Sequence, residues 1–339
     1  MNKNLRWGIL GTGNIARQFA DGVNRTAQRG QLLAVGSRSD ATAREFAQAR
    51  QIPVAHSAYN DLLTDENVDA IYISLPNSLH HEWTLKALKA GKHVLCEKPF
   101  ALAAAQAQEM FDTARKASRV LVEAFMYRSH PLTHAVIDSV RAGEIGDIRL
   151  VRTSFCYKTG RIEGNVRFDR KLGGGALMDI GCYCINFSRL ITGEEPASVS
   201  AVAHLHDRGV DDLAVATMKF PSGIVASFTC GMNLHADNTA YVCGSEGYIE
   251  APIPWKPPVE NAIYTLARST PPRMDLAAGA KVPPRETRSV DAPAELYAME
   301  ADDFAAAVLD GKPPALSERD TLGNMAVLDE MRRQIGLSF

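Results

Sequence analysis

Residues 5–23, LRWGILGTGNIARQFADGV, join a short apolar segment to a glycine turn and then to an amphipathic segment. At the junction, Gly11, Gly13 and Ala16 form a G-x-G-x-x-A pattern, which between a strand and a helix is typical of dinucleotide-binding proteins. Gly11 permits the tight turn, Gly13 lets a pyrophosphate approach the backbone, and Ala16 allows close packing of helix on strand. Free N–H groups at the helix start would face the phosphates. The cofactor contacts predicted from this turn are Gly11, Thr12, Gly13, Asn14 and Ile15.

The sequence as far as residue 124 alternates short apolar runs with longer amphipathic runs. The apolar runs include LLAVGS, AIYISL, HVLCEK and VLVEAF, and helical runs such as ATAREFAQAR and HEWTLKALKA lie between them. Strands and helices in alternation predict a doubly wound parallel sheet with helices on both faces. We therefore expect an α/β protein in which residues 1–124 form a Rossmann domain that binds NADP or NAD.

The pattern changes near residue 145 to longer stretches with period-two alternation, such as IRLVRTSFCYK, DLAVATMKF and GIVASFTCGM. Such a series predicts a large, mostly antiparallel sheet, and residues 125–339 are expected to form a second, α+β domain. The Pro-rich segments 251–262 and 269–287 are expected to be loops or irregular edge strands. Two helical patterns, 296–311 and 317–336, close the chain, and Ser317 is the expected N-cap of the second.

Composition and charge limit the classes of function. A chain of 339 residues exceeds what one core usually holds, and a net charge of −2 weighs against a nucleic-acid or membrane-surface partner. The six cysteines are scattered in apolar segments without zinc-site spacing, so we expect them to be reduced and buried and expect no metal. No apolar run approaches a membrane span, and the N-terminal segment lacks an apolar targeting region, which favours a cytoplasmic protein.

The second predicted strand ends in VGSRSD, residues 35–40, where an NAD-binding domain usually has an acidic residue for the ribose 2′-hydroxyl. Here Ser37, Arg38 and Ser39 occupy the strand end, with Asp40 after them. An arginine and hydroxyl groups suit a 2′-phosphate. The sequence therefore favours NADP over NAD, with Ser37 and Arg38 as contacts.

Several further stretches resemble one oxidoreductase family over nearly the whole chain. They are LPNSLHHE at 75–82, AGKHVLCEKP at 90–99 and GGGALMDIGCYCINF at 173–187. The chain resembles the glucose-fructose oxidoreductase, inositol dehydrogenase and rhizopine catabolism (Gfo/Idh/MocA) family. The resemblance implies a Rossmann domain followed by a sheet domain, and a dehydrogenase or reductase acting on CH–OH groups with a nicotinamide cofactor.

The resemblance also assigns roles near the EKP motif. In the family this lysine lies between nicotinamide and substrate; it matches Lys98, at a strand end where doubly wound sheets bind ligands, and its bond to Pro99 is often cis. His80 is expected either to contact the cofactor or to pack at a helix start, and Tyr59 to flank the adenine end. The further cofactor contacts implied are Leu75, Pro76, Asn77, Glu97, Lys98 and Arg167.

A second cluster lies in GGGALMDIGCYCINF, where Asp179 and Tyr183 are four residues apart and would share one helix face. Many family members carry histidine where this chain has Tyr183, whereas the glucose-fructose oxidoreductase and dihydrodiol or xylose dehydrogenase branches carry tyrosine. The resemblance implies Lys98, Tyr183 and Asp179 as the catalytic residues. A nearby ammonium and the positive nicotinamide are expected to favour the tyrosinate of Tyr183. Arg128 is a further candidate without an assigned role.

The branch resemblance predicts a cytoplasmic NADP-dependent dehydrogenase for a cyclic sugar, acting at aldose C1 or on a related polyol or dihydrodiol. One alternative is a reductase for a keto-sugar of the 1,5-anhydrofructose type. Others are an oxidoreductase or redox-assisted glycosidase that retains its cofactor, and a non-catalytic NADP sensor. By resemblance we also expect a homo-oligomer, a dimer or tetramer, that buries the open face of the second sheet.

Overall fold

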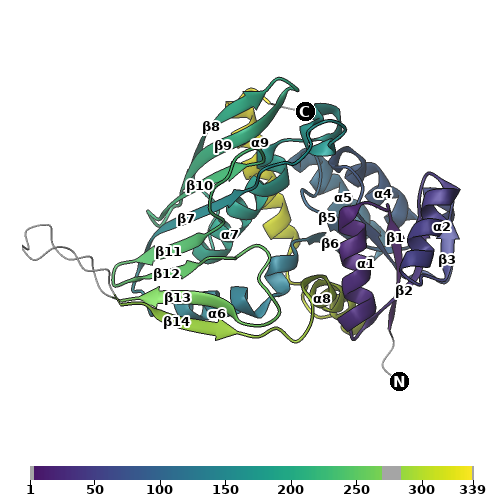
Figure 1. Ribbon diagram of the computed structural model, residues 1–339, viewed down its shortest axis with the longest axis horizontal. Coiled ribbons are helices and arrows are strands. Elements are labelled where there is room, and N and C mark those ends of the chain that lie inside the picture. The colour runs from purple at the N-terminus through teal and green to yellow at the C-terminus, as the bar shows by residue number, and fades with distance from the viewer. Residues whose placement is uncertain (1–3, 269–283, 338–339) are drawn as a thin grey trace, which may run out of the picture.

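The computed structural model describes residues 4–268 and 284–337, which contain two large sheets (Figure 1). The first has six parallel strands in the order β3-β2-β1-β4-β5-β6. Its order reverses between β1 and β4, as expected for a doubly wound sheet. The strands are β1 (Leu5–Leu10), β2 (Gly30–Gly36), β3 (Val54–His56), β4 (Ala70–Ile73), β5 (His93–Glu97) and β6 (Leu121–Ala124). The intervening helices are α1 (Asn14–Thr26), α2 (Asp40–Ala49), α3 (Tyr59–Thr64), α4 (His80–Lys89) and α5 (Ala104–Ala117).

The second sheet has eight strands in the order β14-β13-β12-β11-β7-β10-β9-β8. Every neighbouring pair is antiparallel except β7 and β10, so the expected mostly antiparallel sheet is confirmed. Its strands are β7 (Ile148–Cys156), β8 (Ser198–His206), β9 (Val210–Lys219), β10 (Val225–Gly231), β11 (Ala240–Gly244), β12 (Tyr248–Ala251), β13 (Ala262–Ala267) and β14 (Glu286–Val290). The remaining helices are α6 (Pro131–Arg141), α7 (Cys182–Thr192), α8 (Leu296–Asp310) and α9 (Glu318–Gln334).

Helices α7 and α9 cover one face of the second sheet and lie between it and the first sheet (Figure 1). The covered face is apolar: Ala214, Ala216 and Phe228 alternate with outward residues and are buried. The outer face carries exposed Val202 and Val215, which pair directly across β8 and β9. Period-two alternation thus sorts the strands into a core face and an open face.

Helix α8 returns from the second half of the sequence to pack on α1, β1 and β2, as Figure 1 also shows. The ring of Phe304 in α8 lies 5.1 Å from that of Trp7 in β1. Gly22 of α1 is a close-approach position, because an added Cβ would lie 3.2 Å from Cβ of Tyr297. The division at residues 124/125 stays a prediction, and α8 belongs spatially with the first sheet.

Several local expectations are confirmed. Ser317 caps α9 in a capping box with Asp320. All six cysteines are free, and five of them are buried. The segment between β12 and β13 is a loop, whereas residues 269–283 of the second Pro-rich segment lie outside the described residues.

Within residues 4–268 and 284–337, no helix is long and apolar enough to cross a membrane. The same described ranges hold no group of three His, Cys, Asp or Glu side chains that could hold a metal ion. The cytoplasmic location stays a prediction.

Candidate active site

A cleft of about 400 Å³ lies at the carboxyl ends of β1, β2, β4 and β5. All fifteen residues predicted as cofactor contacts line it, so the structure brings together groups from seven separate stretches of the chain. Asn77 also ties the cleft to the second half of the molecule, because its Nδ2 donates to the carbonyl of Gly173 at 2.8 Å. The lining residues predicted from sequence are Gly11, Thr12, Gly13, Asn14, Ile15, Ser37, Arg38, Tyr59, Leu75, Pro76, Asn77, His80, Glu97, Lys98 and Arg167.

The glycine turn fits a dinucleotide for two structural reasons. Gly11 has φ +108°, a left-handed conformation that side chains disfavour, and an added Cβ would lie 3.1 Å from Oγ of Ser74. A Cβ added at Gly13 would meet nothing within 4 Å, so this backbone faces open space. Helix α1 starts directly after it without a side-chain cap, which leaves its first N–H groups for phosphates.

The end of β2 presents Ser37, Arg38 and Ser39 to the same cleft. Asp40 is engaged elsewhere, since its Oδ2 accepts from Nε of Arg44 at 2.7 Å. Burial raises the pKa of Tyr59, and the Arg38 guanidinium close to its hydroxyl offsets part of that rise. In the described part of the chain Arg38 forms no ion pair, which leaves its charge for a ligand.

His80 is buried, and both of its ring nitrogens face backbone carbonyls. Nδ1 lies 2.9 Å from the Pro99 oxygen and Nε2 lies 2.8 Å from the Leu75 oxygen. The imidazole therefore joins the β4 loop to the turn after β5, and this placement agrees with the packing alternative. The Lys98–Pro99 bond is cis, as the resemblance implied.

A second pocket of about 440 Å³ opens on the other side of Lys98. Lys98, Arg167 and Asp179 line both spaces and separate them. Tyr183 and Tyr157 line only the second pocket. A group placed between the two spaces would contact the proposed catalytic residues from both sides.

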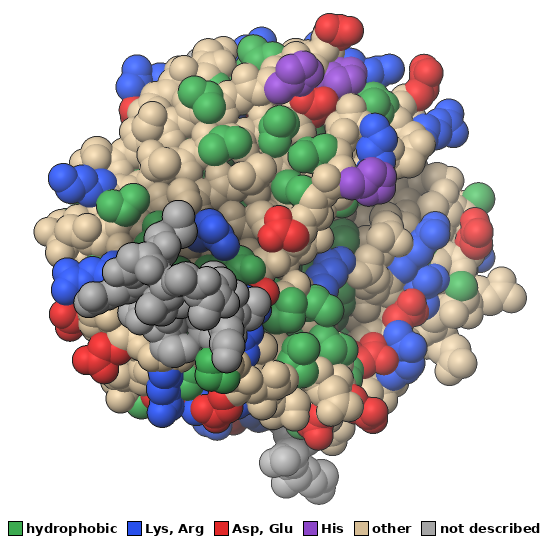
Figure 2. All heavy atoms as spheres, turned by 60° about the vertical axis from the view of Figure 1, so that its left-hand side comes forward, with side chains coloured by type: hydrophobic (Ala, Val, Ile, Leu, Met, Phe, Trp, Pro, Cys, Tyr) green, Lys and Arg blue, Asp and Glu red, His purple; other side chains and the backbone are tan. Residues whose placement is uncertain are grey.

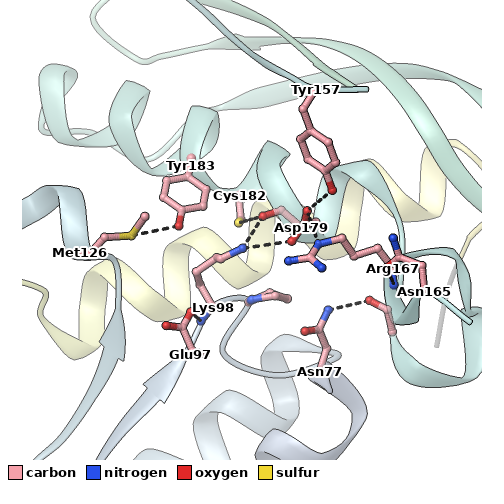
Figure 3. Close-up of polar contacts among 12 residues, drawn as sticks. Asn77, Glu97, Lys98, Met126, Tyr157, Asn165, Arg167, Asp179, Cys182 and Tyr183 are labelled. Carbon is pink, nitrogen blue, oxygen red and sulfur yellow. Dashed lines mark hydrogen bonds and ion pairs between the residues drawn. The ribbon is translucent and has the colours of Figure 1, made fainter. Parts of the chain in front are cut away.

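Lys98 points from the end of β5 toward Asp179, with the ring of Tyr183 beside it (Figure 3). Its Nζ donates to the backbone oxygen of Asp179 at 2.6 Å and to Oδ1 at 3.2 Å, and lies 5.0 Å from the centroid of the Tyr183 ring. Burial alone would lower the pKa of Lys98, but the Asp179 carboxylate together with Cys182 and Glu97 outweighs it, and the pKa is raised. Lys98 is thus held as an ammonium.

Asp179 collects three donors on one buried carboxylate. Its Oδ2 accepts from the Tyr157 hydroxyl at 2.7 Å and from Nε of Arg167 at 2.9 Å, while Lys98 binds Oδ1. Burial would raise the pKa of Asp179, but Lys98 and Arg167 hold it well below its usual range. The carboxylate is therefore an anchor that fixes the two cations.

The glycine-rich turn before Asp179 makes this placement possible. Gly175 has φ +126°, and a Cβ there would lie 2.2 Å from Oδ1 of Asp211. Asp211 in turn accepts from the backbone N–H of Leu177 at 2.7 Å, at the start of a π-helical turn over Leu177–Gly181. Asp179 lies in this turn and Tyr183 at the start of α7, and both reach the second pocket. Such π-turns are frequent at functional sites.

Tyr183 lies among aromatic rings, with Phe125, Phe155 and Trp255 at centroid distances of 5.0, 5.3 and 5.9 Å. Its hydroxyl lies 3.2 Å from Sδ of Met126 (Figure 3). Burial raises the pKa of Tyr183 well above its usual value. Burial, followed by the nearby Glu97 carboxylate, therefore outweighs the lowering expected from Lys98, so the tyrosinate is not favoured in this arrangement.

Arg128 lies outside both pockets and has a structural role. Its guanidinium donates to the Ala315 carbonyl at 3.0 Å and to Oδ1 of Asn186 at 3.2 Å. Sequence reasoning missed Tyr157, Met126 and Lys256, all of which line the second pocket. Tyr157 lies near the end of the predicted strand-like stretch IRLVRTSFCYK, residues 148–158, and directly follows the observed β7; this position was the available signal.

Comparisons with known proteins agree with this geometry. Residues 5–125 match the oxidoreductase family with an NAD-binding Rossmann fold, and residues 133–250 match the GFO/IDH/MocA C-terminal domain. The chain is 33% identical to mouse trans-1,2-dihydrobenzene-1,2-diol dehydrogenase over 99% of this chain and 98% of the relative. It is 30% identical to D-xylose 1-dehydrogenase (NADP(+)) 2 of Haloferax volcanii over 96% and 95%.

Among solved structures, KijD10 from Actinomadura kijaniata superimposes with a TM-score of 0.88, 31% identity and 98% coverage of both chains. That protein is described as a 3-ketoreductase and was crystallised with NADP and TDP-benzene.

Proposed function

Because the chain belongs to the GFO/IDH/MocA family of NAD(P)-dependent oxidoreductases, we propose that it transfers a hydride between NADP and a cyclic sugar. The reacting carbon is C1 of an aldose, or a CH–OH carbon of a related polyol or dihydrodiol. The observation that carries the proposal is the Lys98–Asp179–Tyr183 cluster, which lies where the dinucleotide cleft and the second pocket meet.

The residues suit proton transfer coupled to hydride transfer. The nicotinamide supplies the hydride acceptor or donor; the chain must bind the reacting oxygen and move its proton. Lys98 and Tyr183 both have raised pKa values, so both hold a proton at neutral pH. They are therefore set to donate to a carbonyl oxygen, which favours reduction at neutral pH and alcohol oxidation at alkaline pH. Arg167 and Asp179 keep the lysine aimed at the junction.

The preference for NADP is supported by the Arg38 guanidinium, which forms no ion pair with a described residue, and by the ion pair between Asp40 and Arg44. Two compared proteins, the xylose dehydrogenase and the ketoreductase, carry NADP in their descriptions. The sugar or dihydrodiol substrate class is supported by the names of the relatives and by polar side chains, such as Asn165 and Asp179, in the lining of the second pocket. Keto-sugar reduction is the alternative, favoured by the ketoreductase relative and by the protonated Lys98 and Tyr183.

The first test follows absorbance at 340 nm with NADP or NAD and a panel of aldoses and dihydrodiols, and with NADPH and keto-sugars. Turnover with one class, abolished in Lys98→Ala and strongly reduced in Tyr183→Phe, is expected. A nicotinamide signal that stays with the protein and gives no net NADPH would instead support the retained-cofactor alternatives.

The cofactor preference has its own test that needs no substrate. Arg38→Ala is expected to weaken NADPH binding about 10-fold or more, because a charge-assisted contact contributes on the order of 1.5–3 kcal/mol, and to leave NADH binding unchanged. Arg333→Ala, exposed on α9 and outside the cleft, is the matched control. Equal losses for NADPH and NADH in titrations of cofactor fluorescence would reject the 2′-phosphate assignment.

We also propose that the open face of the second sheet forms the interface of a homo-oligomer. Val202, Val215 and Val225 lie on this face with 67%, 44% and 40% exposure. Figure 2 shows hydrophobic side chains set among polar atoms on the side where this sheet lies. Static light scattering at micromolar concentration tests the proposal, and a monomer would contradict it.

A further inference from the structure

The second pocket has an excess of positive charge, although the whole chain has a net charge of −2. Its charged lining residues are Lys98, Lys158, Arg161, Arg167 and Lys256 against Glu97 and Asp179. Five cations therefore face two carboxylates around a space of about 440 Å³.

The two carboxylates are already committed to other partners. Asp179 binds Lys98 and Arg167 (Figure 3). Glu97 is buried and accepts a hydrogen bond from the Tyr72 hydroxyl. Neither carboxylate forms an ion pair with the other three cations.

Lys158, Arg161 and Lys256 have no carboxylate partner within the described ranges of the chain. Nζ of Lys158 donates to Oδ1 of Asn233 at 2.6 Å, and Nζ of Lys256 donates to Oε1 of Gln18 at 3.3 Å. Arg161 donates no side-chain hydrogen bond to a described residue. These bonds to neutral amides hold the lysines in place without neutralising them.

The three cations converge from separate segments. Lys158 and Arg161 follow β7, whereas Lys256 lies in the loop between β12 and β13. Burial and the neighbouring Lys98 lower the pKa of Lys256, so the charged form of this lysine is disfavoured in its present surroundings. Like charges gathered without counter-charges are typical of a site completed by an anion.

The anion is not a cofactor phosphate by position. None of the three residues lines the dinucleotide cleft. That cleft has its own phosphate-binding groups, which are Arg38 and the start of α1. They line only the pocket on the other side of Lys98, where the substrate is placed.

We propose that the substrate carries a phosphate group, bound by Lys158, Arg161 and Lys256 while its sugar ring lies against Lys98 and Tyr183. This inference rests on the proposed function and narrows its substrate class to phosphorylated sugars. A terminal monophosphate and a nucleoside diphosphate supply the same chemistry, and the substrate panel separates them. Phosphate groups are bound by arginine and lysine through charge-assisted hydrogen bonds.

The test compares three substrates with the full-length protein: a free sugar, the same sugar with a terminal phosphate, and its nucleoside diphosphate ester. The expected result is a kcat/KM at least about 10-fold higher for one phosphorylated form than for the free sugar. This increase should come from a lower KM, with kcat little changed. In Arg161→Ala and Lys256→Ala this preference ratio falls toward one, and in wild type it decreases with added salt. Arg149→Ala, exposed on β7 and outside the pocket, leaves the ratio unchanged.

Binding is measured in parallel, by calorimetry of the phosphorylated sugars with the NADPH-loaded protein. Tighter binding of a phosphorylated sugar that is lost in Arg161→Ala supports the inference even if no turnover is found, in which case the proposed function fails and the phosphate site stands. Turnover of free sugars without a phosphate preference, or an equal loss for free and phosphorylated sugars in the variants, overturns the inference and leaves the proposed function intact.

Discussion

Replacing Asp179 by asparagine keeps the shape of the side chain and removes the charge that holds Lys98 as an ammonium. In the structure this carboxylate has an Oδ1 at 3.2 Å from Nζ of Lys98, and the two side chains are only 12% and 11% exposed. The variant leaves Lys98 and Arg167 as neighbouring cations with no anion between them. We expect the pKa of Lys98 to fall.

The size of the change follows from the distance. Two unit charges 3.2 Å apart interact by about 5 kcal/mol at an effective dielectric constant near 20, so the loss of this attraction should lower the pKa of Lys98 substantially. Burial already opposes the charged form of Lys98 in the wild type, so in the variant it is no longer offset by the Asp179 carboxylate. The lysine of the variant should therefore lose its proton at a lower pH than the lysine of the wild type.

The assay is kcat/KM for NADPH oxidation with the best carbonyl substrate, measured at 340 nm across pH 5.5 to 9.5. Wild type should be nearly flat at neutral pH, and Asp179→Asn should lose activity as pH rises through the new pKa of Lys98. The loss at alkaline pH is expected to reach about 10²-fold, the typical value of a positioned acid. NADPH titration checks that the variant is folded and loaded.

Tyr157→Phe is the matched control, because it removes a neutral donor 2.7 Å from the same carboxylate and leaves its charge. It should lower activity with little change in the shape of the profile. If Asp179→Asn lowers the rate equally at every pH, the carboxylate does not act through the charge of Lys98 and the reasoning is refuted.

Three further predictions concern stability and assembly. Burial raises the pKa of Glu123 to about 8, so the folded state keeps a proton that the unfolded chain releases above its ordinary pKa of 4.5. The free energy of unfolding therefore falls as pH rises between these two values, by up to about 1.4 kcal/mol per pH unit. Urea unfolding from pH 5 to pH 8 should show a flatter dependence in Glu123→Gln, and parallel curves would contradict this. Gly175→Ala should lower the free energy of unfolding by about 3 kcal/mol or more, because of its positive φ and the contact of the added Cβ with Asp211. Gly193→Ala, with φ +69° and open space around it, should lower it by about 1 kcal/mol. Equal melting temperatures of the two variants would reject the turn argument. Val215→Glu on the open sheet face should give the mass of a monomer in light scattering, whereas Val54→Glu on the edge of the first sheet should not. An unchanged mass in Val215→Glu would place the interface elsewhere.

The first sheet and the cofactor cleft could be predicted from sequence because their signals are local. A glycine pattern between a strand and a helix fixes the turn, and strand ends of a parallel sheet meet at one edge. The predicted cofactor contacts accordingly lie together in one cleft. The spacing of Asp179 and Tyr183 also predicted that both side chains reach one pocket, and both line the second pocket although the intervening turn is π-helical.

What sequence reasoning missed depends on tertiary packing. Lys256 lies in a Pro-rich loop far along the chain, and only the fold brings it to Lys98. The aromatic rings around Tyr183 come from three different segments, so the burial that raises its pKa had no local sign. His80 was ambiguous because a helix-start histidine gives no indication of which carbonyls its ring will meet.

The return of α8 to α1 limits how this protein can be recombined. Phe304 and Tyr297 of α8 lie on Trp7 and Gly22, so part of the core of the first sheet is supplied from the other end of the chain. A chimera joined after residue 124 would give the nucleotide-binding half of one parent a foreign α8, with a mismatched volume beside Gly22 and Trp7. When this half is exchanged between relatives, residues 296–310 should therefore come from the same parent. In a library of chimeras joined only at the boundary read from the sequence, many members would have a mismatched core and would be destabilised.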